Sequence, residues 1–129
     1  MTSTRAPSKI IPRAFPGIEP DEVEEVIANC KINSYPPGTL LCREDNVEST
    51  FYMILEGDVE VTKRIENADR RLLKTLGAGD FFGEMALIHN APRAASVTAK
   101  TNVVVLELDK DGFNRVLQRS SSIALAMVK

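Results

Sequence analysis

The stretch that decides the fold is DFFGEMALIHNAPRAASV, residues 80–97 of a chain of 129 residues. Gly83 permits the backbone to turn out of a strand, and residues 84–88 provide about one helical turn in a region otherwise of β type. Pro92 stiffens the return of the chain, and Arg93 stands at the start of the next β segment. The stretch predicts a short helix between two strands, with an arginine beside it.

An anion site follows from this arrangement. The first backbone N–H groups of a helix have no intrahelical partner, and the helix dipole makes that end positive. The small neighbours of Arg93 leave room for a ligand, and a guanidinium offers a bidentate fork that suits a phosphate. Those neighbours are Ala91, Ala94 and Ala95. An arginine that faces such a pocket is expected to make few contacts within the protein, so its replacement is expected to leave thermal stability nearly unchanged.

Glu84 has the wrong charge to contact the same phosphate, so it is expected to face another part of the ligand. A carboxylate only accepts hydrogen bonds, and sugar hydroxyls donate them. A cyclic phosphate on one side and a ribose 2′-hydroxyl on the other fit the pair of Arg93 and Glu84. The alternative is an ion pair between these two residues that closes an ordinary turn, and their spacing alone does not choose between the two interpretations.

Short β-type segments lie on both sides of this stretch, separated by turn residues. They span residues 39–43, 50–55, 59–64, 71–76, 95–99 and 102–108. Glu56-Gly57-Asp58 and the polar segment 66–69 are typical of hairpin turns. Several short strands at even spacing predict a mainly β fold with flanking helices, in which the strands form a β-roll or jelly-roll barrel.

Helical patterns flank the strands. From Pro20 to about Lys31 the apolar residues recur at i, i+3, i+4 and i+7, which predicts an amphipathic helix. Asp109 is the expected N-cap of C-terminal hinge helices, whose pattern resumes after Ser120–Ser122. Residues 1–14 have no apolar period, so we expect a flexible leader there that contributes little, and a single domain over residues 15–129.

Composition and charge exclude several classes of protein. With 16 Lys and Arg against 18 Asp and Glu, the chain lacks the basic surface of a nucleic-acid-binding domain. The longest aliphatic run, Val103–Leu106, is far shorter than the ~20 residues that cross a membrane. No export signal is present, because Pro12 interrupts the pair Ile10-Ile11 at once. The two cysteines are distant in sequence and are expected to stay reduced, as in a cytoplasmic protein.

Catalytic and cofactor motifs are missing from the sequence. His89 is the only histidine, whereas jelly-roll enzymes usually need several metal ligands, and its polar surroundings indicate a surface turn. There is no Gly-x-Ser-x-Gly elbow and no P-loop. The glycines at 77, 79 and 83 are spaced one residue too far apart for the dinucleotide fingerprint. We therefore expect a protein that is not an enzyme and holds neither a metal nor a cofactor.

The segment FGEMAL at 82–87, followed by PRAAS at 92–96, closely resembles the phosphate-binding cassette of cyclic nucleotide-binding domains. That family includes the regulatory subunit of cAMP-dependent protein kinase, the cAMP-activated exchange factors and catabolite activator protein. The resemblance extends over residues 15–129. It departs from the family in the loop before residue 50, where relatives often have glycines and this chain has Asp45 and Glu48; aspartate tolerates a left-handed φ better than glutamate does.

The resemblance implies a role for each residue of the cassette. It implies that Arg93 binds the exocyclic phosphate oxygens and that Glu84 holds the ribose 2′-hydroxyl, while backbone N–H groups complete the phosphate cradle. Domains that prefer cGMP often have a threonine at the position of Ala94, so the alanine is similar to the cAMP-preferring type, with cGMP bound more weakly. The ligand-binding residues implied are Gly83, Glu84, Met85, Ala86, Arg93, Ala94 and Ala95.

The leading hypothesis is a cAMP-preferring regulatory module that couples ligand binding to movement of its C-terminal helices. In the family, the residues matching Leu87 and Phe113 exchange packing when the phosphate binds. The implied partners are cAMP and an effector domain or protein reached through those helices, with neither nucleic acid nor membrane bound by this domain. Two alternatives stay open: a ligand-independent interaction scaffold with the same fold, and the sensory fragment of a larger transcription factor, kinase or channel.

Overall fold

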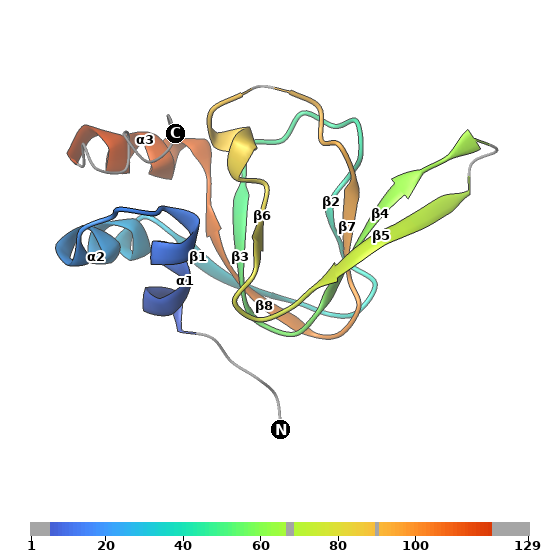
Figure 1. Cartoon of the computed structure of the whole chain (residues 1–129), viewed down its shortest axis with the longest axis horizontal. Helices are drawn as coiled ribbons and strands as arrows, with labels where there is room; N and C mark the ends of the chain where they lie inside the picture. Colours follow the sequence, from blue (N-terminus) through green and yellow to red (C-terminus); the bar gives the residue numbers. More distant parts are fainter. Residues whose placement is uncertain (1–5, 67–68, 90, 120–129) are drawn as a thin grey trace.

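The computed structural model describes residues 6–66, 69–89 and 91–119. Two antiparallel sheets form a β-roll, and the helices gather on one side of it (Figure 1). The helices are α1 (Pro7–Ala14), α2 (Pro20–Ala28), the short 3-10 helix η2 (Glu84–Leu87) and α3 (Lys110–Arg119). The strands are β1 (Lys31–Tyr35), β2 (Leu40–Cys42), β3 (Phe51–Glu56), β4 (Val59–Arg64), β5 (Arg70–Leu76), β6 (Phe81–Phe82), β7 (Ser96–Ala99) and β8 (Val103–Leu108). The predicted fold class is confirmed.

The two sheets have four strands each. One has the order β1-β8-β3-β6, and the other has the order β2-β7-β4-β5. The stretch of residues 80–97 connects them, since it begins with β6 in the first sheet and enters β7 in the second. Long connections between sheets make the roll, and the cassette lies where the chain crosses from one sheet to the other (Figure 1).

All six predicted strands are present, and β6 is the strand expected before the turn at Gly83; β1 was not predicted. The first helix was expected to end at about Lys31 but already ends at Ala28, and β1 begins at Lys31. Its residue Ile32 faces solvent, so the strand has no apolar alternation to detect. β6 has only two residues and pairs through Tyr52↔Phe82.

Local capping explains where two helices begin. α2 has a capping box in which the side chain of Glu19 accepts from the backbone of Glu22, and Glu22 accepts from the backbone of Glu19. At α3, a carboxylate oxygen of Asp109 accepts from the backbone N–H of Gly112 at 2.7 Å. The N-cap predicted at Asp109 is therefore confirmed, while the pattern predicted after residue 120 lies outside the described residues.

The expectation of a leader over residues 1–14 is wrong for residues 7–14, which form helix α1. Ile10 and Ile11 of this helix are completely buried in the core. The guanidinium of Arg13 donates to the carbonyl of Gly79 at 2.7 Å, which ties the helix to the turn before β6. Two adjacent isoleucines in a helix of eight residues are too few to produce a visible period, so only their tertiary packing reveals the helix.

The core has two parts. One lies between the helices and the β1-β8-β3-β6 sheet, where the ring of Phe51 packs edge-on against Phe15 and Phe81, with centroids 5.7 and 5.8 Å away. The other fills the inside of the roll between the two sheets. Within the described residues, no helix is long and apolar enough to cross a membrane.

Candidate ligand-binding site

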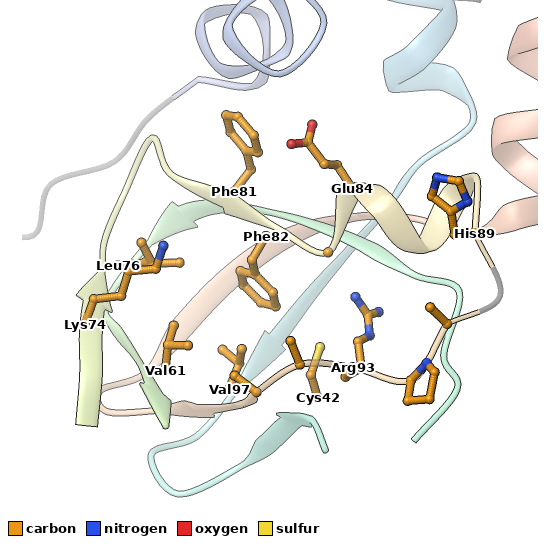
Figure 2. Close-up of a pocket in the computed structure, with 15 residues that line it drawn as sticks. Cys42, Val61, Lys74, Leu76, Phe81, Phe82, Glu84, His89, Arg93 and Val97 are labelled. Atoms are coloured by element: carbon orange, nitrogen blue, oxygen red, sulfur yellow. The ribbon is translucent and has the colours of Figure 1, made fainter. Parts of the chain in front are cut away.

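A pocket of about 520 Å³ lies between the cassette and the inner face of the roll (Figure 2). Its volume is within the range of small-molecule sites, roughly 300–1,000 Å³. Most of its lining belongs to the segment between β6 and β7, and the opposite wall comes from β2, β4 and β5. The lining residues are Cys42, Val61, Lys74, Leu76, Phe81, Phe82, Gly83, Glu84, His89, Ala91, Pro92, Arg93, Ala94, Ala95 and Val97.

Arg93 is the buried charge of this pocket, with 9% of its surface exposed. One terminal nitrogen of its guanidinium donates to the carbonyl of Thr50 at 2.6 Å. The Nε lies 3.8 Å from a carboxylate oxygen of Glu48, and this buried Nε–H has no hydrogen-bond acceptor among the described residues. A buried guanidinium with an unused donor is costly unless an acceptor is supplied. The site therefore has both the charge and the hydrogen-bonding capacity to receive an anion.

Gly83 makes room for that guanidinium. A Cβ at this position would lie 2.4 Å from Nη1 of Arg93 and 3.0 Å from the carbonyl oxygen of Thr50. The residue also has a φ of +85°, in the left-handed region that side chains rarely adopt. Both conditions select glycine, so the turn predicted at Gly83 also serves the placement of Arg93.

The loop before β3 holds the backbone of Arg93 on its other side. Arg93 donates its N–H to the carbonyl of Asn46 at 2.8 Å, and its carbonyl accepts from the N–H of Asp45 at 2.9 Å. Asp45 has a φ of 72°, which fits its position among the family's glycines. In the same loop, Glu48 contributes the carboxylate that faces Arg93. The departure from the family pattern thus supplies the arginine's counter-charge.

Glu84 begins the 3-10 helix η2 and is partly buried at the edge of the pocket. Figure 2 shows its carboxylate pointing away from the guanidinium of Arg93. In the described part of the chain, the ion pair of Arg93 is formed with Glu48, not with Glu84. The alternative in which Glu84 and Arg93 close a turn is therefore not what the structure contains, and the carboxylate is available to another group.

The far wall of the pocket is mainly apolar. Val61, Leu76 and Val97 line it, and the ring of Phe82 stacks on Tyr52 with centroids 4.8 Å apart. Lys74 of β5 reaches the same wall from the hairpin (Figure 2). An anion-binding end and an apolar end with one ammonium suit a ligand that combines a phosphate with a flat, apolar ring system.

The chain matches the model of the cyclic nucleotide-binding domain over residues 32–120. It belongs to the cyclic nucleotide-binding domain family. It is 46% identical over 81 residues to the cAMP-dependent protein kinase regulatory subunit of Yarrowia lipolytica, covering 63% of this chain and 21% of that protein. It is 35% identical over 99 residues to cGMP-dependent protein kinase 2 of Homo sapiens, covering 75% of this chain and 13% of that protein. The domain thus spans about a fifth or less of these relatives.

Solved structures agree with the family. The regulatory domain of Toxoplasma gondii PKA, solved with cAMP, superimposes with a TM-score of 0.78 at 31% identity, covering 85% of this chain and 42% of that one. The catabolite activator protein of Thermus thermophilus has a TM-score of 0.79 at 25% identity, covering 88% of this chain and 54% of that one. The resemblance stated from the cassette is therefore confirmed, and so is the β-roll of the family.

The structure brings five of the implied ligand-binding residues of this cyclic nucleotide-binding domain to one pocket. They are Gly83, Glu84, Arg93, Ala94 and Ala95. The side chains of the other two, Met85 and Ala86, lie outside what the structure describes. Their implied roles toward a ligand stay predictions. His89 is exposed, as the surface-turn interpretation expects, and also reaches the pocket rim.

Several residues that line the pocket or contact Arg93 were not assigned to the site from the sequence. Glu48 and Thr50 approach Arg93 from a loop more than 40 residues earlier, and no local pattern announces that contact. Lys74 and Phe82 do carry a signal, because strand alternation places every second residue of β5 and β6 on the inner face. Alternation around Leu76 would have selected Lys74.

The two cysteines of the domain show no sign of reactivity. Cys42 lies on the pocket wall, and burial raises its pKa to about 12, although the charge of Arg93 acts in the opposite direction. Burial, with a smaller contribution from Asp109, also raises the pKa of Cys30 to about 12. Both are free thiols that stay protonated near neutral pH, so neither is a nucleophile.

The two implied switch residues lie in one apolar cluster. Leu87 of η2 and Phe113 of α3 are both buried, and the cluster also contains Ile10 and Ile11 of α1. A continuous packed core therefore runs from the end of the cassette to the C-terminal helix. Whether these two side chains exchange packing on ligand binding stays a prediction of the resemblance.

Proposed function

We propose that the chain is a regulatory module that binds cAMP, with cGMP bound more weakly, and has no catalytic activity of its own. The observation that carries the proposal is Arg93, a buried guanidinium with an unused donor at one end of the pocket. Its acceptors within the protein are few, and a phosphate offers two oxygens in the geometry of the fork. The cassette's resemblance and the cAMP-binding relatives support the same ligand.

Three parts of the ligand would meet three parts of the site. The cyclic phosphate would lie against Arg93 and the backbone N–H groups around Ala86, Ala94 and Ala95. The ribose 2′-hydroxyl would donate to Glu84, whose carboxylate points away from the guanidinium. The base would lie along the apolar wall near Phe82.

The preference for cAMP rests on Ala94, because an alanine offers no hydroxyl for the amino group of guanine. Ala94→Thr would add one hydrogen bond to cGMP, on the order of 1 kcal/mol or several-fold in affinity. We also propose that ligand binding moves the C-terminal helices and so controls an effector. A cytoplasmic location is part of this proposal, and the two unpaired thiols support it.

Calorimetry with cAMP and cGMP tests the proposal on the parent, Arg93→Lys and Arg93→Ala. Removing the charge-assisted contact should cost about 1.5–3 kcal/mol, a loss of roughly ten- to a hundredfold in affinity for cAMP. Arg93→Lys keeps the charge but loses the fork, so it should bind less tightly than the parent.

Arg71→Ala is the matched control, because this exposed arginine of β5 lies outside the pocket. Its affinity for cAMP should equal that of the parent. Absence of cAMP binding by the parent would favour the scaffold hypothesis and reject the receptor function, whereas unchanged affinity in Arg93→Ala would reject the binding role given to Arg93. Equal or tighter binding of cGMP by the parent would reject the base preference alone.

A further inference from the structure

The hairpin of β4 and β5 projects from the roll on the side opposite the helices (Figure 1). The hydrogen bond from the N–H of Ile65 to the carbonyl of Asp69, 2.9 Å long, closes its outer end. Residues 70–75 are exposed without exception. The outer half of the hairpin therefore belongs to neither core, so packing does not determine which residue types stand there.

Two pairs of cations lie directly opposite each other in this outer half. Lys63 is paired with Arg71, and Arg64 with Arg70. Like charges at directly opposite positions of an antiparallel pair destabilise it. Among the described residues, the one ion pair of these cations joins Arg64 to Asp45 at 4.0 Å, with both side chains largely exposed, and such pairs contribute little; the carboxylate of Glu44 accepts from the backbone N–H of Arg64. The hairpin thus carries unbalanced positive charge that folding of the domain does not require.

Exposed aliphatic side chains accompany the cations. Ile65, Leu72 and Leu73 are 47%, 52% and 49% exposed, and no other segment of the described chain has three large apolar residues so exposed together. The sequence of β5 places two leucines between two arginines and Lys74, with no acidic residue. A surface of this kind fits a partner that supplies both carboxylates and aliphatic groups.

β5 is also an edge strand. It ends the sheet order β2-β7-β4-β5, so one side of its backbone faces no other strand of the described residues. An exposed edge accepts an extended segment by main-chain hydrogen bonds. The register shifts near Leu73, where Val61 is paired with Lys74 and Thr62 with Leu72. This irregularity leaves Leu73 without a partner in the register with β4.

We propose that the free edge of β5 binds an extended, acidic and aliphatic segment of a partner protein, which adds to the sheet as a further strand. Side chains alternate between the two faces of a strand, so Arg70 and Arg71 point to opposite faces. A partner lying on one face reaches only one of them. An added strand has side chains on both faces and can place a carboxylate beside each arginine.

The same residues select against other partners. A membrane or a nucleic acid presents anionic groups but no extended polypeptide backbone that could pair with the free edge of β5. Two copies of β5 pairing with each other would bring arginines close to arginines, which opposes self-association. A protein segment with consecutive carboxylates and aliphatic side chains can form hydrogen bonds with the free edge, pair with the arginines and pack against the leucines at the same time.

The test uses the whole chain and a fluorescent octapeptide, Val-Glu-Glu-Val-Val-Glu-Glu-Val, whose carboxylates and valines complement residues 70–74. Fluorescence anisotropy should show saturable binding that weakens as salt increases. Replacing both Arg70 and Arg71 by glutamate should weaken it by about tenfold or more, and so should replacing Leu72 and Leu73 by serine. The matched control is Lys31→Glu with Lys100→Glu, which changes the same charge at exposed sites elsewhere and should bind as the parent does.

Two further experiments distinguish strand addition from simple charge attraction. An octapeptide with N-methyl groups on alternate backbone nitrogens keeps its side chains but loses main-chain donors, so it should bind at least tenfold less tightly. Hydrogen exchange should show new protection of β5 amides with the unmodified peptide only. Equal binding of the methylated peptide, no binding at all, or preferential binding of phosphatidylserine vesicles or single-stranded RNA would overturn the proposal. The measurements are made without nucleotide, because Arg70 and Arg71 lie outside the pocket but Lys74 lines it.

Discussion

Arg93 shows how a single residue serves both the fold and the ligand. From the sequence alone, we expect that an arginine facing a pocket makes few contacts within the protein and therefore has little influence on thermal stability. In the structure it is buried, donates to the carbonyl of Thr50 and faces Glu48. The expectation of few contacts is wrong, because both partners come from a loop far away in sequence.

Replacing Arg93 should therefore change the stability of the ligand-free protein. Arg93→Ala leaves the carbonyl of Thr50 without this donor and Glu48 without its counter-charge, at an expected cost of about 1–3 kcal/mol. Thermal denaturation without nucleotide measures this loss. Arg43→Ala is a suitable control, because Arg43 lies in the same loop with an exposed side chain. Equal melting temperatures for Arg93→Ala and the parent would contradict the contacts described.

Gly83 provides the second prediction at this scale. Gly83→Ala introduces a Cβ 2.4 Å from the guanidinium of Arg93 and strains a φ of +85°. The strain alone costs about 1–3 kcal/mol, and the displaced arginine should lower cAMP affinity by about tenfold or more. Gly38→Ala separates the two effects: its φ of +89° carries the same strain, but no atom lies within 4 Å of the added Cβ. The control should lose stability and keep its cAMP affinity; equal affinity losses in both variants would contradict the steric argument.

Among the elements, the strands were more predictable than the helices. Alternation and turns located six strands, five of which have buried residues in one of the two cores, while β5 contacts the inner core only through the half-buried Leu76. β1 was not predicted because its apolar residue Ile32 faces solvent. α1 was not predicted because two adjacent isoleucines do not produce a helical period. Of the site, sequence identified Glu84 and Arg93 from local motif and chemistry. The pairing of Arg93 with Glu48 joins residues 45 positions apart and only tertiary structure defines it.

Helix α3 depends on contacts at its first turns. Asp109 caps it by accepting from Gly112, and a Cβ on Gly112 would lie 2.7 Å from the carbonyl oxygen of Asn29 at the end of α2. Arg115 then donates from Nε to the side-chain oxygen of Asn29 at 2.8 Å. At the other end of the helix, Arg119 forms an ion pair with Glu25 of α2 at 3.5 Å, so α3 contacts α2 along its length.

The cap at Asp109 should control how firmly α3 is held. Asp109→Ala removes the acceptor for the N–H of Gly112 and should cost about 1 kcal/mol. Hydrogen exchange should therefore accelerate in α3, while protection of β3 and β8 follows only the change in global stability. Asp109→Asn keeps a side-chain oxygen and should behave nearly as the parent does. Exchange in α3 that is equally fast in the alanine and asparagine variants would exclude capping as the cause.

At the scale of the whole molecule, pocket and helices form one continuous body. The cassette ends at Leu87, which is buried with Phe113 of α3, and α1 joins the same cluster through Ile10 and Ile11. Arg13 of α1 also binds the carbonyl of Gly79 at the turn before β6. A displacement of the cassette therefore cannot occur without repacking against at least one helix, because close-packed cores transmit small shifts rather than absorbing them.

Ligand binding should consequently be detected in α3 as well as in the pocket. At a cAMP concentration of 100 times Kd, binding stabilises the native state by about 2.7 kcal/mol. Protection against hydrogen exchange that depends on global unfolding therefore rises throughout the domain. A helix coupled to the ligand is recognised because its protection rises by more or by less than this global amount. Hydrogen exchange with cAMP measures this. Adenosine 5′-monophosphate, which has the base and sugar but no cyclic phosphate, is the control that should leave α3 unchanged. Arg93→Ala, which binds cAMP less tightly, should show a smaller change in α3 than the parent at the same cAMP concentration. A ligand shifts an equilibrium only by its differential affinity for the two arrangements. Changes confined to residues 83–96 would mean that both arrangements of Leu87 and Phe113 bind cAMP equally, and the domain would then be a receptor without a switch.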